Sequence, residues 1–328
     1  MDLTPSASTS FSPNRHPIRG YFFIASAALC WGISATLGRA VFTGRLFASG
    51  GALSPIDPLL LSQSRTTFSL LVLVPILLAV RGRNGMRLPK RELWRAMVIG
   101  VVGVAASNYF YYLAIQKTNV ATAIILQYTA PVWVLLYMVA RRLQRATAQR
   151  VIAIVLALFG IALVIDVFGG GGLRLNHVGV LAALGASLSL ACTNVFGGAL
   201  VQKHDRWKAL VYVLLGAVVF WLVVNPPWKI VAAHYSGRQW LFLAIFAVTS
   251  VLLPFSLYFS GLHHLDPTRA IVTSCLEPVF SIAIAATALG EIVGPIQIVG
   301  MVLVLAATLM VQMPEKSGGR AMLVEPME

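Results

Sequence analysis

The chain has 328 residues, of which 58% are hydrophobic and 11% are charged, and its formal net charge is +14. A soluble domain carries about 25% charged residues, so this composition excludes an ordinary soluble protein. A positive charge of this size could indicate nucleic-acid binding. The basic residues, however, fall in alternate loops between apolar runs, which is typical of a membrane protein.

Ten apolar runs follow one another along the chain. Each is about 17–25 residues long, enough to cross a hydrocarbon core of roughly 30 Å as a helix, whereas barrel strands would be about half that length. We therefore predict an all-α integral membrane protein with ten transmembrane helices. The predicted spans are residues 20–40, 57–80, 96–115, 119–140, 149–167, 177–201, 208–224, 240–262, 268–289 and 294–313.

The loop charges predict how these spans are oriented. If the N-terminus is cytoplasmic, 18 of the 25 lysines and arginines lie on the cytoplasmic side and 6 on the opposite side, with Arg65 inside a span. This asymmetry favours both termini in the cytoplasm. Residues 1–17 are rich in Ser, Thr and Pro and are predicted to form a disordered cytoplasmic tail. Residues 314–328 are predicted to form a second cytoplasmic tail.

A sequence repeat divides the ten spans into two halves. The segment 123–133, with Pro131 in its middle, returns 147 residues later as segment 270–280, where Pro278 takes the same place. Five spans per copy, an odd number, turn the second copy upside down. We predict two inverted five-helix repeats, residues 18–167 and 176–313, joined by a Gly-rich linker at 168–175. This is the usual architecture of a secondary transporter.

Two charged residues, Glu277 and Arg65, lie well inside predicted spans and away from the span ends, where charges are costly and usually functional. Glu277 precedes Pro278 near the middle of the ninth span. It could bind a substrate ammonium group or accept a proton, or it could be a protonated carboxyl group hydrogen-bonded between helices. Arg65 could neutralise Glu277, bind a carboxylate or phosphate, or extend toward the membrane interface. The two prolines can break their helices and free backbone carbonyls at a cavity.

Further polar and aromatic residues gather near the centre of the repeat. Any one of them is more often an interhelical contact than a ligand contact, but together they indicate a central site. The predicted substrate-binding and translocation residues are Trp31, Asn108, Tyr112, Gln127, Asn194, Tyr258, Ser274 and Glu277, with Arg65 as a candidate charge partner and Pro131 and Pro278 as helix breaks.

Motifs for other kinds of chemistry do not occur in the sequence. The three cysteines lie within apolar spans and have no zinc-ligand spacing, and neither a Walker A sequence nor a hydrolase motif occurs. We therefore expect no metal, no cofactor and no enzymatic activity.

Several short motifs occur in a fixed order. The first copy carries Cys30-Trp31-Gly32, Arg65, Thr118-Asn119-Val120-Ala121 and Pro131, and the second carries Tyr258, Glu277-Pro278-Val279 and Gly290-Glu291. Their order and spacing over residues 18–313 resemble the drug/metabolite transporter superfamily, EamA-like family. Within it the pattern is most like the YddG-type exporters of aromatic and other amino acids. Gln144 stands where family members often carry an acidic residue.

The resemblance implies a multi-pass exporter of the bacterial inner (plasma) membrane. Its central cavity would lie between the halves, lined by spans one, three, four, six, eight and nine. We predict a secondary transporter that exports small amphipathic metabolites, foremost aromatic or neutral amino acids, by alternating access. Another metabolite or drug class, a membrane-embedded enzyme and a non-transporting scaffold are the alternatives. Membrane lipids and protons are further expected partners, and nucleic acid is not. The sequence leaves open the substrate, proton antiport versus facilitated diffusion, and the oligomeric state.

Overall fold

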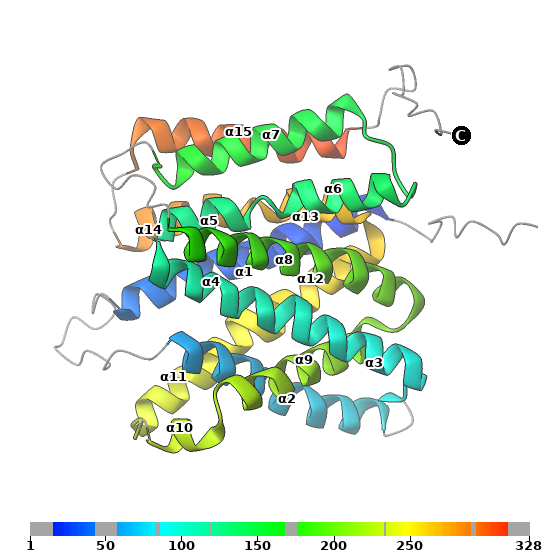
Figure 1. The fold of residues 1–328 in the computed structure, drawn as a ribbon, viewed down its shortest axis with the longest axis vertical. Coiled ribbons are helices and arrows are strands. Elements are labelled where there is room, and N and C mark those ends of the chain that lie inside the picture. The colour runs from blue at the N-terminus through cyan, green and yellow to red at the C-terminus, as the bar shows by residue number, and fades with distance from the viewer. Residues whose placement is uncertain are drawn as a thin grey trace, which may run out of the picture.

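The computed structural model describes residues 16–42, 58–82, 86–118, 120–167, 176–232, 234–289 and 293–313 (Figure 1). All regular secondary structure in these ranges is helical. Residues 1–15 and 314–328 of the predicted tails, the predicted linker at 168–175, Asn119 and Gly290-Glu291 lie outside the described residues.

Nine helical stretches of the described chain are long and apolar enough to cross a membrane, and they match nine of the ten predicted spans. The remaining predicted span, 149–167, is the fifth in chain order. It corresponds to α7 (Ala148–Val164), an apolar helix of only 17 residues. The helices that span without interruption are α1 (Pro17–Phe42), α2 (Pro58–Arg81), α8 (His177–Lys203), α9 (Arg206–Val224) and α15 (Pro295–Gln312), and the short α10 covers Pro227–Ala232.

Two predicted spans are each built from two helices. The first break, at Tyr128 and Thr129, separates α5 (Val120–Gln127) from α6 (Ala130–Ala140). The second, at Cys275 and Leu276, separates α13 (Pro267–Ser274) from α14 (Glu277–Leu289). Each residue of the second break lies 147 positions after its counterpart in the first. In both α6 and α14 the second residue is proline, which lacks the N–H that would continue the preceding helix.

Two other spans contain a π-helical turn. In the first, α3 (Lys90–Val98) continues through η2 (Ile99–Ala105) into α4 (Ala106–Lys117). In the second, α11 (Gly237–Ala247) continues through η3 (Val248–Leu252) into α12 (Leu253–His264). Both stretches are 28 residues long, and they begin 147 residues apart, at Lys90 and Gly237. The repeat seen in the sequence is therefore also a repeat of these helix irregularities.

The helices form successive layers along the long axis of the molecule (Figure 1). At one end α7 packs against α15; the broken spans form the next layer; α1 and α8 run through the middle; and α2, α9 and α11 lie at the other end. The helices α1 and α8, which begin the two halves, have corresponding neighbours. α1 packs against α12 and α14, while α8 packs against α4, α5 and α6.

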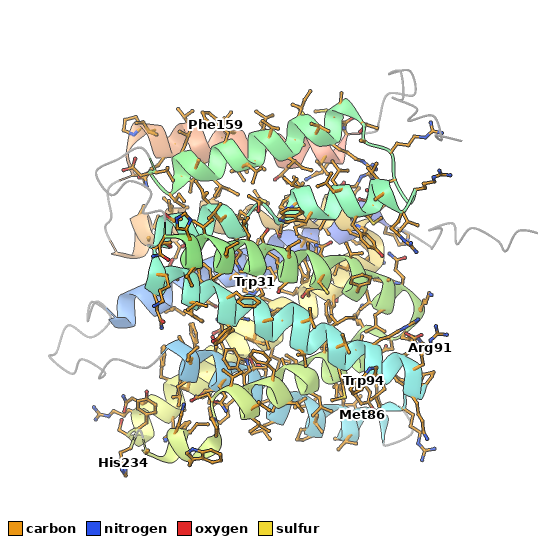
Figure 2. The ribbon with its side chains drawn as sticks, viewed as in Figure 1. Trp31, Met86, Arg91, Trp94, Phe159 and His234 are labelled. Carbon is orange, nitrogen blue, oxygen red and sulfur yellow. The ribbon has the colours of Figure 1, made fainter. Side chains whose placement is uncertain are left out.

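Glycines allow several of these helices to approach closely. A Cβ atom added to Gly300 would lie 2.6 Å from the backbone oxygen of Gly160, where α15 crosses α7. A Cβ at Gly100 of η2 would meet the backbone oxygen of Val213 in α9. Small residues at helix crossings are typical of membrane proteins, in which lipid is as apolar as the helix surface. Large apolar side chains face outward instead, as Phe159 on α7 does (Figure 2).

Candidate functional site

The two helix breaks meet beside an acidic residue, Glu277. Glu277 is the first residue of α14, and Tyr128 of the other break packs against Cys275 and Leu276 and interacts with the Glu277 carboxyl group. Arg65 of α2 lies close enough to interact electrostatically with Glu277, and Tyr111 of α4 interacts with both. An acidic group, a basic group and two phenols therefore share one interior region, which we call the Glu277 cluster.

Arg65 is held in this region by Asn108 of α4. The guanidinium donates a hydrogen bond of 2.5 Å to Asn108 Oδ1, and the Asn108 amide donates to the Val104 carbonyl over 2.8 Å. Among the described residues Arg65 forms no ion pair, so its charge is not cancelled by contact with Glu277. A guanidinium carries five N–H donors, which leaves most of them able to bind a ligand.

A second group of predicted residues meets around Tyr258 of α12. Asn194 of α8 donates a hydrogen bond to the Tyr258 hydroxyl, and Ser274 of α13 interacts with the same group. The Trp31 ring of α1, near the centre of the molecule in Figure 2, has its centroid 5.4 Å from that of Tyr258 and 5.6 Å from that of Phe255. Asn194 is fully buried, and its Oδ1 has no hydrogen-bond partner among the described residues.

Gln127 and Tyr112 are placed less centrally than the sequence predicts. The Gln127 amide reaches the Ser107 hydroxyl over 3.5 Å, at the limit of a hydrogen bond. Tyr112 contacts the ring of Tyr111, with 5.7 Å between centroids, and its hydroxyl makes no hydrogen bond to a described residue. The fold thus gathers the other predicted residues into two clusters. Gln127 and Tyr112 adjoin these clusters without a hydrogen bond to Glu277 or Tyr258 among the described residues.

The sequence prediction omitted Tyr128, Tyr111 and Thr129 from the site. Tyr128 packs against Cys275 and Leu276 beside Glu277, and the hydroxyls of Thr129 and Ser187 share a hydrogen bond of 2.9 Å that joins the first break to α8. The repeat itself pointed to them, because Tyr128 and Thr129 occupy the break within the duplicated segment. In the described ranges no group of three His, Cys, Asp or Glu side chains could hold a metal ion.

Comparison with known families follows the same division of the chain. The model of the EamA-like transporter family matches twice, over residues 18–166 and over residues 177–313. The chain belongs to the EamA-like transporter family. The two matches nearly coincide with the predicted repeats. This EamA-like protein is therefore a multi-pass membrane transporter of small molecules and not an enzyme, and the predicted family is confirmed.

Curated relatives of this EamA-like chain are transporters, and their sequence identity to this chain is low. The threonine/homoserine exporter RhtA of Salmonella typhimurium is 28% identical over 269 residues, which are 80% of this chain and 85% of that protein. An uncharacterized transporter of Archaeoglobus fulgidus is 27% identical over 254 residues, 77% of this chain and 86% of its own. The uncharacterized inner membrane transporter YicL of Salmonella typhimurium is 22% identical over 240 residues, which are 71% of this chain and 77% of that protein.

A solved crystal structure shares the fold. It is 19% identical, has a TM-score of 0.70, and the similarity covers 90% of this chain and 98% of the other. At this identity the likeness concerns the arrangement of helices alone.

Proposed function

We propose that this EamA-like transporter exports aromatic or neutral amino acids by alternating access around the Glu277 cluster. The observation that carries the proposal is the meeting of the two helix breaks at Glu277 and Tyr128, with Arg65 nearby but not ion-paired to the carboxyl group. Broken helices that point polar groups into the interior are a recurring way to build a substrate site in transporters.

The chemistry of an amino acid fits this pair of charges. The Glu277 carboxylate would bind the substrate ammonium group, while the free donors of Arg65 would bind the substrate carboxylate, in a geometry suited to a planar guanidinium. Tyr111 and Tyr128 would supply hydroxyl groups beside them, and Tyr112 and Trp31 apolar faces for the side chain. The name of RhtA as a threonine/homoserine exporter supports this substrate class. The likeness to YddG-type exporters favours aromatic substrates within it.

The proposed mechanism also uses the symmetry of the chain. The corresponding places of α1 and α8, and the irregularities repeated at 147 residues, support two inverted repeats of five spans, with α7 as the fifth. In this arrangement both termini are cytoplasmic and the protein lies in the bacterial inner membrane. Rocking of one half against the other would expose the Glu277 cluster to each side in turn.

Protons are the proposed coupling ion. A carboxyl group that binds an ammonium group in one state and a proton in the other would exchange the two across the membrane. If transport is instead facilitated diffusion, an imposed pH gradient will leave the rate of amino-acid flux unchanged.

Transport into proteoliposomes tests the proposal. We expect radiolabelled threonine, homoserine or phenylalanine to be taken up by the reconstituted full chain. Glu277→Gln should reduce the rate at least about tenfold, because a hydrogen bond to a charged group contributes about 1.5–3 kcal/mol. Glu92→Gln is the matched control, since Glu92 lies on α3 in an ion pair with Arg95.

Two results would contradict the proposal. One is folded protein that transports none of these amino acids. The other is a Glu277→Gln variant whose rate equals that of the Glu92→Gln control. The first result would exclude these amino acids as substrates, and the second would exclude a role of Glu277 in transport.

A further inference from the structure

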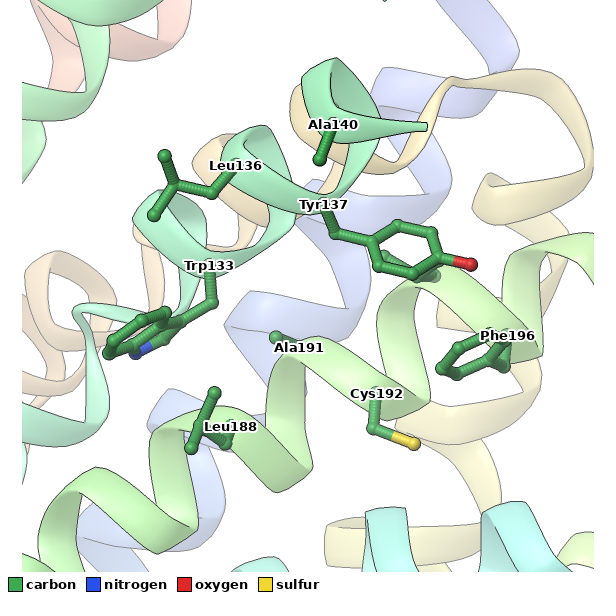
Figure 3. A pocket seen from close by; sticks show the side chains of 9 residues that line it. Trp133, Leu136, Tyr137, Ala140, Leu188, Ala191, Cys192 and Phe196 are labelled. Carbon is green, nitrogen blue, oxygen red and sulfur yellow. The ribbon is translucent and has the colours of Figure 1, made fainter. Parts of the chain in front are cut away.

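An apolar groove of about 420 Å³ runs between α6 and α8, and none of the residues that line it belongs to the Glu277 cluster (Figure 3). Trp133, Tyr137 and Ala140 of α6 line one wall, and Leu188, Cys192 and Phe196 of α8 line the other. Leu188 is 49% exposed and Phe196 is 43% exposed, so the groove opens onto the outer surface of the molecule.

The length of the groove matches one leaflet of a bilayer. Residues 188 to 196 of α8 cover about 12 Å at 1.5 Å per residue, close to half of a hydrocarbon core of roughly 30 Å. Near one end of the groove Tyr137 contacts Phe196, with 5.4 Å between ring centroids. The small side chains of Ala140 and Cys192 leave room between these aromatic groups.

Two basic residues stand directly at one end of the groove. Arg141 and Arg142 follow Ala140, the last residue of α6, and both side chains are exposed. Arg142 has φ 54°, a left-handed conformation that turns the chain sharply at this point. Neither guanidinium makes an ion pair or a hydrogen bond to any residue that the structure describes. An apolar slot one leaflet deep therefore ends in two uncompensated positive charges.

We propose that the groove is a binding site for an anionic phospholipid, with one acyl chain between α6 and α8 and the phosphate on Arg141 and Arg142. The apolar walls select a hydrocarbon chain, and the paired arginines select a negative headgroup over a zwitterionic one. A phospholipid carries a negative phosphate at the end of an acyl chain, which matches two arginines at the end of an apolar groove. A protein partner has no need of this arrangement.

The other end of the groove adjoins the first helix break. Trp133 lies one helical turn after Thr129, and Leu188 follows Ser187, so the Thr129–Ser187 hydrogen bond of 2.9 Å stands at this end. The tail of the bound lipid would therefore lie against the break without entering the Glu277 cluster. The site does not depend on which substrate the protein carries.

Native mass spectrometry of the purified full chain tests the proposal. Palmitoyl-oleoyl phosphatidylglycerol and the matching phosphatidylcholine are added at equal concentration. We expect the phosphatidylglycerol to remain bound in preference to the phosphatidylcholine. Arg141→Gln together with Arg142→Gln should weaken its binding at least about tenfold, since each basic residue near a headgroup is worth about a factor of five. Cys192→Phe, which fills the groove, should weaken the binding of both lipids.

Matched controls separate this site from general charge and bulk. Arg87→Gln with Arg91→Gln removes two exposed charges from another basic segment, and Val302→Phe adds a ring at an exposed position of α15. Both controls should bind phosphatidylglycerol like the unmodified chain. Equal retention of the two lipids by the unmodified chain, or an unchanged affinity after Cys192→Phe in protein that elutes as a folded species, would overturn the proposal.

Discussion

Replacing Gly32 with alanine should loosen the contact that positions Glu277. Gly32 of α1 lies against the first turn of α14. A Cβ atom added there would be 2.9 Å from the backbone nitrogen of Ser281 and 3.2 Å from the carbonyl oxygen of Glu277. Ordinary contacts of this kind lie at 3.4–4 Å. The added Cβ would also lie 2.9 Å from Phe280 Cβ, which is bonded directly to the backbone. Because none of these atoms is the far end of a flexible side chain, none can move aside, and α1 must shift away from α14.

The expected cost follows from three terms. Overpacking of this kind costs about 1–3 kcal/mol. The Thr36 hydroxyl, one turn along α1, donates to the Ser281 carbonyl over 3.1 Å, and lengthening this bond would remove up to about 1 kcal/mol. Alanine is favoured over glycine in a helix by about 1 kcal/mol. The net loss for Gly32→Ala is therefore about 0–3 kcal/mol with a middle value of about 1.5 kcal/mol, or several degrees in Tm at about 2–4 °C per kcal/mol.

Thermal unfolding of purified protein in detergent measures this loss, and Gly198→Ala of α8 is the control. A Cβ at Gly198 would meet side-chain atoms no closer than 3.6 Å, so the helix preference of alanine should raise its Tm slightly. The two variants should thus shift Tm in opposite directions. A Tm for Gly32→Ala equal to or above that of the unmodified chain would refute the reasoning from backbone contact.

Two further predictions concern the ends of α9. Asn225 donates a hydrogen bond of 2.7 Å to Gln63 Oε1, and the two residues are 7% and 2% exposed. Asn225→Ala should therefore lower stability by about 1–3 kcal/mol in thermal unfolding, while Gln63→Leu with Asn225→Leu should recover part of the loss. Asp205 accepts hydrogen bonds from the Trp207 and Lys208 amides at the start of α9 and pairs with Arg81 at 2.6 Å. Asp205→Ala should cost about 1 kcal/mol, and Asp205→Asn, which keeps the cap, should cost less; equal losses would show that the ion pair and not the cap stabilises this end.

The positions of the helix breaks could be predicted from the sequence because proline lacks the backbone N–H that continues a helix. Pro131 and Pro278 at the same place in two copies indicated broken spans, and the breaks occur at the two residues before Ala130 and Glu277. The π-helical turns at 99–105 and 248–252 were not predicted. Their residues are mostly apolar and carry no proline or other helix-breaking signal, and η2 packs against α8 and α9, which lie far from it in the sequence.

The membership of the site was only partly predictable. Glu277 and Arg65 stand out because charges inside a span are rare. Which polar groups meet them depends on how helices distant in the sequence face one another. Arg65 forms its hydrogen bond with Asn108 and not with Glu277. Glu277 interacts with Tyr128, which in the sequence is indistinguishable from an aromatic residue that only packs between helices. Periodicity assigns a side chain to a face of its own helix but does not identify the helix opposite.

The π-helical turn of the third span allows the chain to change length without changing which way its helices face. Such a turn accommodates about one residue more than an α-helical turn. Loss of one residue from 99–105 would convert it to α-helix and leave Met97 and Asn108 oriented as they are. The same loss within α4 would rotate every residue beyond it by about 100°. Single-residue deletions accepted in the course of evolution should therefore accumulate at this turn, where the pairing of Asn108 with Arg65 survives them.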